Sequence, residues 1–126
     1  MTDNKKKILI VEDDEAVSLM YQRKFAQDSY MVLTAEDGAR GLEMAIKEKP
    51  DLIVLDILMP ELDGFSALRQ LRANESTKNI PVVILTVLSD EESKLKGEKF
   101  GATEYIVKSY YTPTEIYEKI KELLER

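Results

Sequence analysis

Short apolar runs that recur along the chain constrain the fold more than any other feature of the sequence. Each run is continuous rather than alternating and is rich in β-branched residues: Ile8–Val11, Leu52–Leu55, Val82–Leu85 and the weaker Tyr105–Val107. Continuous apolar strands of this kind are typical of parallel sheets that are covered on both faces. Met31–Leu33 is a fifth candidate strand, which we expect at an edge of the sheet.

Apolar residues recur at helical spacing between these runs, in the segments Val17–Phe25, Ala39–Ile46, Phe65–Leu71 and Ile116–Leu124. The segment Asp90–Phe100 is the weakest helical pattern, because its apolar content is thin and it contains Gly97. Glycine inside a helix costs about 1 kcal/mol relative to alanine, so we expect this helix to be the most mobile. The alternation predicts an α/β fold, a doubly wound (βα)5 three-layer sandwich with right-handed crossovers.

Helix starts are marked by residues that satisfy free backbone N–H groups. Asp14, Asp37 and Asp63 are predicted caps. Ser89 with Glu92, and Thr112 with Glu115, both fit the capping-box pattern, and Pro113 suits a first helical position.

Composition limits the chemistry that the chain can perform. A length of 126 residues suits one domain, and we expect a single domain over residues 1–126. The net charge of -6 argues against nucleic acid as a direct partner. The absence of cysteine and histidine leaves only oxygen ligands for a metal. No apolar run is long enough to span a membrane, so we expect a soluble, cytoplasmic protein with no membrane partner.

Polar residues follow the apolar runs at the point where each predicted strand ends. Glu12, Asp13 and Asp14 follow the first run, and Asp56, Thr86 and Lys108 follow the later ones. Since ligands bind beyond the carboxyl ends of parallel strands, these side chains are predicted to converge. Helix capping is the favoured role for Asp14, while capping and function both stay open for Glu12 and Asp13. No helix pattern begins directly after Asp56. Thr86 alone would be an ordinary strand-end residue with a satisfied hydroxyl, and Lys108 alone would be a solvated surface lysine.

Clustered carboxylates repel one another, and a hard divalent cation relieves that repulsion. Mg²⁺ suits one or two carboxylates together with waters and phosphate oxygens. Phosphoryl transfer needs mainly positioning and charge stabilisation, which the metal and Lys108 would supply. A carboxylate can act as the nucleophile, and Asp56 is the central candidate because it follows the expected middle strand.

The chain resembles the receiver domains of bacterial two-component response regulators, including stand-alone chemotaxis regulators. The resemblance runs from Lys7 to Leu124 and is carried by five segments: Ile8–Asp14, Pro50–Pro60, Asp63–Gly64, Pro81–Thr86 and Gly101–Lys108. It implies a flavodoxin-like sheet with strand order 2-1-3-4-5.

The resemblance also implies a role for each matching residue. Asp56 would accept a phosphoryl group from a phosphohistidine on a sensor histidine kinase or phosphotransfer protein. Asp13, Asp56 and the backbone carbonyl of Leu58 would hold Mg²⁺, for which Mn²⁺ could substitute, and Glu12 would act through water. Thr86 and Lys108 would bind the phosphoryl oxygens. Tyr105 would be an aromatic switch that turns inward as Thr86 moves; the alternative is an ordinary half-buried strand tyrosine.

The sequence departs from the family pattern near the site. Ser109 follows Lys108 where the family usually has a proline after a cis peptide. Either this peptide is cis, at a cost of about 3 kcal/mol, or it is trans and Lys108 approaches differently. Val87 is bulkier than the usual alanine or glycine, and Leu58 and Leu88 are apolar where polar residues can orient a hydrolytic water. We therefore expect self-dephosphorylation in hours rather than seconds.

The predicted function is a phosphorylation-dependent signalling switch rather than an enzyme. Phosphorylation would shift the population from an inactive to an active arrangement. This shift would change the face formed by the fourth helix, fifth strand and fifth helix, and so control a protein partner. The outer face of the first helix, near Ala16 and Met20, would meet the kinase.

A degenerate receiver that acts as a plain interaction module is one alternative. A metal-dependent phosphohydrolase is another, although Leu58 stands where such enzymes need an acid, and a flavin-binding protein is a third. We expect a monomer or weak dimer, and the pathway stays open.

Overall fold

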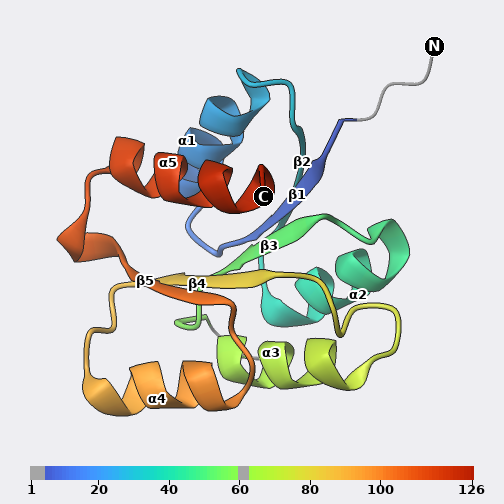
Figure 1. Cartoon of the computed structure of the whole chain (residues 1–126), viewed down its shortest axis with the longest axis vertical. Helices are drawn as coiled ribbons and strands as arrows, with labels where there is room; N and C mark the ends of the chain where they lie inside the picture. Colours follow the sequence, from blue (N-terminus) through green and yellow to red (C-terminus); the bar gives the residue numbers. More distant parts are fainter. Residues whose placement is uncertain (1–4, 60–62) are drawn as a thin grey trace.

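The computed structural model describes residues 5–59 and 63–126 and shows a parallel sheet between two layers of helices (Figure 1). Pro60, which belongs to the resemblance, lies outside the described residues. The 5-stranded sheet has the order β2-β1-β3-β4-β5, which confirms the predicted α/β class and strand order. Its strands are β1 (Lys7–Val11), β2 (Met31–Ala35), β3 (Leu52–Leu55), β4 (Val82–Thr86) and β5 (Glu104–Val107).

Helices cover both faces of the sheet, with α1 and α5 on one face and α2, α3 and α4 on the other (Figure 1). Their bounds are α1 (Glu15–Ala26), α2 (Gly38–Glu48), α3 (Gly64–Ala73), α4 (Glu91–Lys99) and α5 (Pro113–Leu124), with a short 3-10 helix η1 (Lys108–Tyr110) before α5. Each helix lies where the apolar periodicity predicts one. In the part of the chain that the structure describes, no helix has the length and apolar character to cross a membrane.

The strands are continuously apolar because successive side chains point into two different cores. In β1, Leu9 and Val11 belong to the core beneath α2 and α3, while Ile8 and Ile10 belong to the core beneath α1 and α5. Side chains of a strand alternate between the two faces of the sheet, so a strand covered on both faces must be apolar throughout.

Most helix starts follow the predicted caps. Asp14, Asp37 and Asp63 each accept backbone N–H groups of the following helix, and Thr112 forms the predicted capping box with Glu115. These predictions are confirmed.

The predicted capping box of Ser89 with Glu92 is wrong. Asp90 caps α4 instead, and its carboxylate accepts hydrogen bonds from the backbone N–H and the hydroxyl of Ser93, both at 3.0 Å. A carboxylate also interacts favourably with the positive end of the helix dipole, which favours Asp90 over the neighbouring hydroxyl. In α4 the single buried residue is Gly97, as the thin apolar pattern indicates. The greater mobility of α4 stays a prediction.

The strand register places the polar residues side by side. Val11 is the partner of Leu55 between β1 and β3, and Thr86 is the partner of Val107 between β4 and β5. The residues that follow these strands, Glu12, Asp56 and Lys108, therefore meet at the carboxyl edge of the sheet.

Candidate functional site

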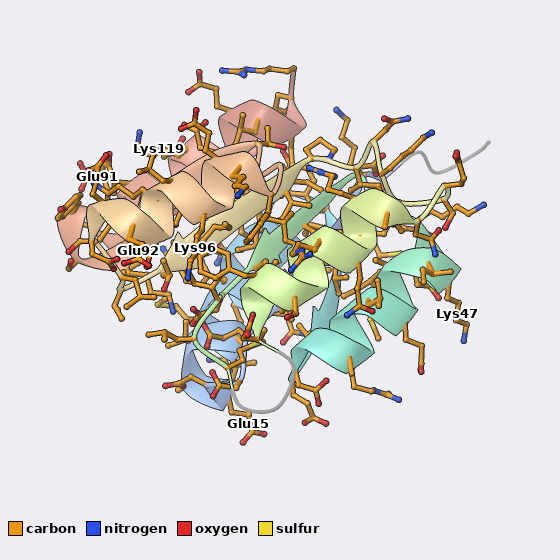
Figure 2. All side chains as sticks on the ribbon, turned by 90° about the horizontal axis from the view of Figure 1, so that it is seen from below. Glu15, Lys47, Glu91, Glu92, Lys96 and Lys119 are labelled. Carbon is orange, nitrogen blue, oxygen red and sulfur yellow. The ribbon has the colours of Figure 1, made fainter. Side chains whose placement is uncertain are left out.

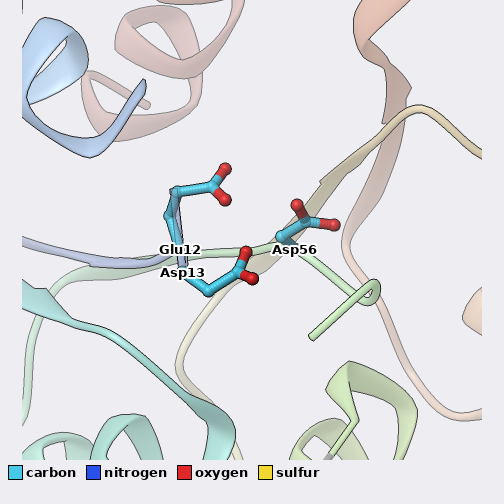
Figure 3. Close-up of side chains that lie close together, drawn as sticks. All are labelled: Glu12, Asp13 and Asp56. Carbon is cyan, nitrogen blue, oxygen red and sulfur yellow. The ribbon is translucent and has the colours of Figure 1, made fainter. Parts of the chain in front are cut away.

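Three carboxylates converge at the carboxyl edge of the sheet (Figure 3). Glu12 and Asp13 follow β1, Asp56 follows β3, and one oxygen of each lies within 4.8 Å of the others. Glu12 and Asp56 are each only 7% exposed, whereas Asp13 is exposed. The site thus combines two buried acids with one that faces solvent.

Lys108, the first residue of η1, brings a positive charge to the buried acids. Its Nζ lies 2.8 Å from Oε1 of Glu12 and 3.3 Å from Oδ2 of Asp56. No cis peptide bond occurs among residues 5–59 and 63–126, so the Lys108–Ser109 bond is trans. Lys108 reaches the site through this trans bond.

Backbone hydrogen bonds fix the second oxygen of each buried acid. Oε2 of Glu12 accepts from the N–H of Asp14 at 3.1 Å, and Oδ1 of Asp56 accepts from the N–H of Leu58 at 3.0 Å. Asp14 itself points away and caps α1 through its Oδ1, which accepts the N–H groups of Ala16 and Val17. Glu12 and Asp56 therefore each present one oxygen to Lys108 in a set orientation.

Burial and charge act against each other in this cluster. Burial raises the pKa of Glu12, and the charge of Asp56 adds to this, while the hydrogen bond from Lys108 opposes it. Burial lowers the pKa of Lys108, but the hydrogen bond to Glu12 and the charge of Asp56 outweigh it and raise the pKa above its ordinary value. Lys108 is therefore charged at neutral pH. One ammonium faces three acidic groups, which leaves an excess of negative charge.

Two hydrogen bonds connect Thr86 to Tyr105 through Leu88, in the loop after β4. Thr86 is fully buried at the end of β4, and its hydroxyl accepts the N–H of Leu88 at 3.3 Å. The carbonyl of Leu88 accepts the hydroxyl of Tyr105 at 2.9 Å. Sequence reasoning assigned Leu88 only a side-chain effect. Its backbone contacts carry no sequence signal, because any residue could make them.

The rim of the site is apolar on one side and polar on the other. Leu58 and Val87 are 46% and 56% exposed. On the other side, a pocket of about 390 Å³ opens beside Asp13, and Glu36 and Arg40 also line it. Sequence reasoning missed both residues: Glu36 follows the edge strand β2, and Arg40 lies in the first turn of α2.

The donor set fits a hard divalent cation. Carboxylate oxygens with access to solvent are the ligands that Mg²⁺ accepts alongside its retained waters. Asp13 is exposed, which leaves room for waters, and Asp56 lies close enough to share one ion with it. The hydrogen bond from the Leu58 N–H to Asp56 fixes the backbone next to the carbonyl that is predicted to be a further ligand.

Comparison with known proteins identifies a family that matches most of the chain. A family model described as "Response regulator receiver domain" matches residues 8–121. The alkaline phosphatase synthesis transcriptional regulatory protein PhoP of Bacillus subtilis is 39% identical over 121 residues, which are 96% of this chain and 49% of PhoP. The chain thus spans about half the length of the first curated relatives that it matches.

Solved structures agree in fold. The chemotaxis protein CheY4 of Vibrio cholerae matches with a TM-score of 0.86 and 30% identity, over 94% of this chain and 98% of CheY4. The BeF3-activated receiver domain of Klebsiella pneumoniae RstA matches with a TM-score of 0.85 and 30% identity, over 96% of this chain and 100% of that domain.

Proposed function

Because this chain belongs to the response regulator receiver domain family, we propose that it is a signalling switch whose phosphoacceptor is Asp56. One observation carries the proposal. The Asp56 carboxylate lies inside the acidic cluster, with Lys108 Nζ at 3.3 Å from its Oδ2. A nucleophile for phosphoryl transfer needs this combination of fixed position and nearby positive charge.

In the proposed reaction, an oxygen of Asp56 attacks the phosphorus of a phosphohistidine. A new P–O bond forms as the P–N bond breaks, and the imidazole leaves with the electron pair of that bond. The N–H of Leu58 holds Oδ1 of Asp56, which orients the carboxylate. Lys108 then pairs with a phosphoryl oxygen, because its ammonium already lies within reach of Asp56.

Asp13, Asp56 and the carbonyl of Leu58 would hold Mg²⁺, and Glu12 would act through a water. When bound, the ion would neutralise the charge that gathers on the phosphoryl oxygens. Mn²⁺, which prefers similar ligands, could replace it.

The proposed switch is a population shift between two arrangements of the β4–α4 loop. Thr86 would move toward the phosphoryl oxygens and Tyr105 would turn inward, with Leu88 between them. The readout would be the α4–β5–α5 face, where a groove of about 500 Å³ is lined by Lys94, Tyr105 and Tyr110 among others. A surface of this kind can present a different shape to a protein partner in each state.

The proposed donor is a sensor histidine kinase or a phosphotransfer protein, which would meet α1 near Ala16 and Met20. PhoP is named as a transcriptional regulatory protein, and this chain matches 49% of it. For this chain we propose a protein target, with no direct contact to nucleic acid or membrane. We also propose a cytoplasmic location and a monomeric or weakly dimeric state.

The alternatives make different demands on the site. Receiver domains are phosphoacceptors rather than turnover enzymes, and a phosphohydrolase would want an acid at Leu58. A degenerate interaction module would lack a carboxylate of the cluster, and Glu12, Asp13 and Asp56 are all in place.

The test is phosphorylation by acetyl phosphate with and without Mg²⁺, followed by intact mass spectrometry. The parent should gain one phosphoryl group only when Mg²⁺ is present. Asp56→Asn should gain none, while Asp37→Asn, which makes the same change at a helix cap outside the cluster and keeps an oxygen that can cap the helix, should behave as the parent. An unmodified parent with donor and Mg²⁺ together would contradict the proposal.

A further inference from the structure

Gly97 lies in the last turn of α4 and is the one residue of that helix that is buried. A Cβ added at Gly97 would lie 2.9 Å from Cδ2 of Tyr105 and 3.0 Å from Cδ1 of Ile84. Real Cβ atoms essentially never show a contact as short as the one to Tyr105, and the contact to Ile84 is tighter than most, so the missing side chain is what lets α4 approach the tyrosine ring.

The Tyr105 ring has little freedom to yield. Its backbone is fixed in β5, where it is the register partner of Ile84, and its hydroxyl is held by the carbonyl of Leu88 at 2.9 Å. Cδ1 of Ile84 is the end of a flexible side chain and can rotate away. The tyrosine ring is rigid and held at both ends, so a methyl group at Gly97 must displace the ring, the helix or the hydrogen bond.

Two further contacts join the C-terminal half of α4 to α3. Phe100, the C-cap of α4, packs on Phe65 of α3 with ring centroids 5.9 Å apart. Lys96 lies on the side of α4 that is nearer α3 (Figure 2), with its Nζ 5.9 Å from the centre of the Phe65 ring. The contact of Gly97 with Tyr105 is where the last turn of α4 meets the sheet, so the two positions depend on each other.

We infer that the position of Tyr105 seen here, with its ring against Gly97 and its hydroxyl on the Leu88 carbonyl, is the inward position of the switch, and that Gly97 is a positioning residue whose missing side chain provides the seat for that ring and so sets how often Tyr105 occupies it. This inference rests on the proposed function, in which Tyr105 is the switch. The same glycine that weakens α4 as a helix gives the tyrosine its place beneath the helix. A side chain at position 97 would fill this seat. It would therefore disfavour the inward position of Tyr105, and with it the arrangement that a phosphoryl group stabilises.

The geometric half is tested by fluorine NMR on protein labelled with 3-fluorotyrosine. The chain has 6 tyrosines, and Tyr105→Phe identifies the resonance of Tyr105. Gly97→Ala should move that resonance. The matched control is Gly41→Ala, since a Cβ at this helical glycine would lie 2.8 Å from the Val11 side chain, far from the tyrosine in the fold. Gly41→Ala should leave the Tyr105 resonance in place. If Gly97→Ala leaves the Tyr105 resonance unmoved, or if both variants move it alike, the claim that Gly97 positions the Tyr105 ring is contradicted.

The functional half is tested by the rate of phosphorylation by acetyl phosphate in Mg²⁺. Gly97→Ala should slow phosphorylation by about 2- to 30-fold, the usual range for coupling through a packed contact. In a Tyr105→Leu background, which removes the ring that needs the seat, Gly97→Ala should have no further effect. Equal slowing in both backgrounds, or no slowing in either, would overturn the inference. A parent that takes up no phosphoryl group would contradict the proposed function itself, while the NMR result would still decide whether the seat exists.

Discussion

Lys108 donates a 2.8 Å hydrogen bond to Glu12, so a cation that follows the last strand neutralises a buried acid that follows the first. The side chains are 21% and 6% exposed, respectively. This ion pair connects the carboxyl end of β1 to the carboxyl end of β5. The second contact of Lys108, to Oδ2 of Asp56, is longer at 3.3 Å. Lys108 therefore competes with any bound metal for the same carboxylates.

Replacing Lys108 should expose this competition. Lys108→Met should lower the free energy of unfolding in EDTA by about 2 kcal/mol, because it leaves the buried Glu12 without its partner. Added Mg²⁺ should raise the stability of this variant more than that of the parent, since the tethered cation no longer competes. Urea unfolding with and without Mg²⁺ measures both effects.

The control is Lys78→Met, which removes an exposed pair with Glu75 whose atoms lie 2.8 Å apart. It should change stability by less than about 1 kcal/mol and leave the Mg²⁺ effect as in the parent. Equal losses for Lys108→Met and Lys78→Met would show that the buried pair has no special role.

Asp13 should contribute strongly to Mg²⁺ affinity and little to the stability of the fold. Asp13→Asn should weaken Mg²⁺ binding by about tenfold or more, because it removes a proposed direct ligand. The side chain is exposed, so the free energy of unfolding in EDTA should change little. Isothermal titration calorimetry and urea unfolding test the two halves separately. Unchanged Mg²⁺ affinity would remove Asp13 from the ligand set.

The apolar rim should make the phosphorylated state long-lived. Leu58 is 46% exposed and next but one to Asp56, where it offers no group to orient an attacking water. After removal of the donor, the parent should lose its phosphoryl group in hours, and Leu58→Asn should lose it faster. Gels that separate the phosphorylated form can follow the decay. A parent that decays in seconds without a phosphatase would refute this expectation.

The sequence predicts the sheet well because the signal for each strand is local. A short, continuous, β-branched apolar run such as Leu52–Leu55 is typical of a strand covered on both faces. Caps such as Asp37 and Asp63 are also local, since the carboxylate binds N–H groups only a few residues away. The meeting of polar residues at the carboxyl edge follows from the strand order alone.

The remaining features depend on contacts that no local pattern records. Ser89 and Asp90 are both residue types that cap helices, so the capping pattern alone does not choose between them, and the structure has Asp90 as the cap. Gly97 looks like a defect in a helix until the ring of Tyr105 is placed against it. The pairing of Lys108 with Glu12 depends on side-chain reach across the sheet, whereas the sequence pointed only to a phosphoryl contact.

Tyr30 provides a test of the fold that is independent of the site. Burial, with help from Glu125 and Asp28, raises the pKa of Tyr30 from 10.0 to about 12. The fold therefore favours the neutral phenol. Its contribution to stability is fully present below the unfolded value and is lost as the pH rises through the folded value.

The free energy of unfolding should thus fall as the pH rises above the ordinary tyrosine pKa, and it should fall less steeply in Tyr30→Phe. An absorbance titration of the phenolate groups should lose its highest-pH step in this variant. Tyr110→Phe, which removes a tyrosine that is 60% exposed, should keep that step. A titration that Tyr30→Phe leaves unchanged would contradict the assignment.

The most direct test of the account is to locate the phosphoryl group chemically. Borohydride reduces an aspartyl phosphate to homoserine, so peptide mass mapping after treatment with acetyl phosphate, Mg²⁺ and borohydride identifies the modified residue. We predict homoserine at Asp56 and at no other position. Homoserine at Asp13 or elsewhere, or none at all in protein that remains folded, would contradict the central claim.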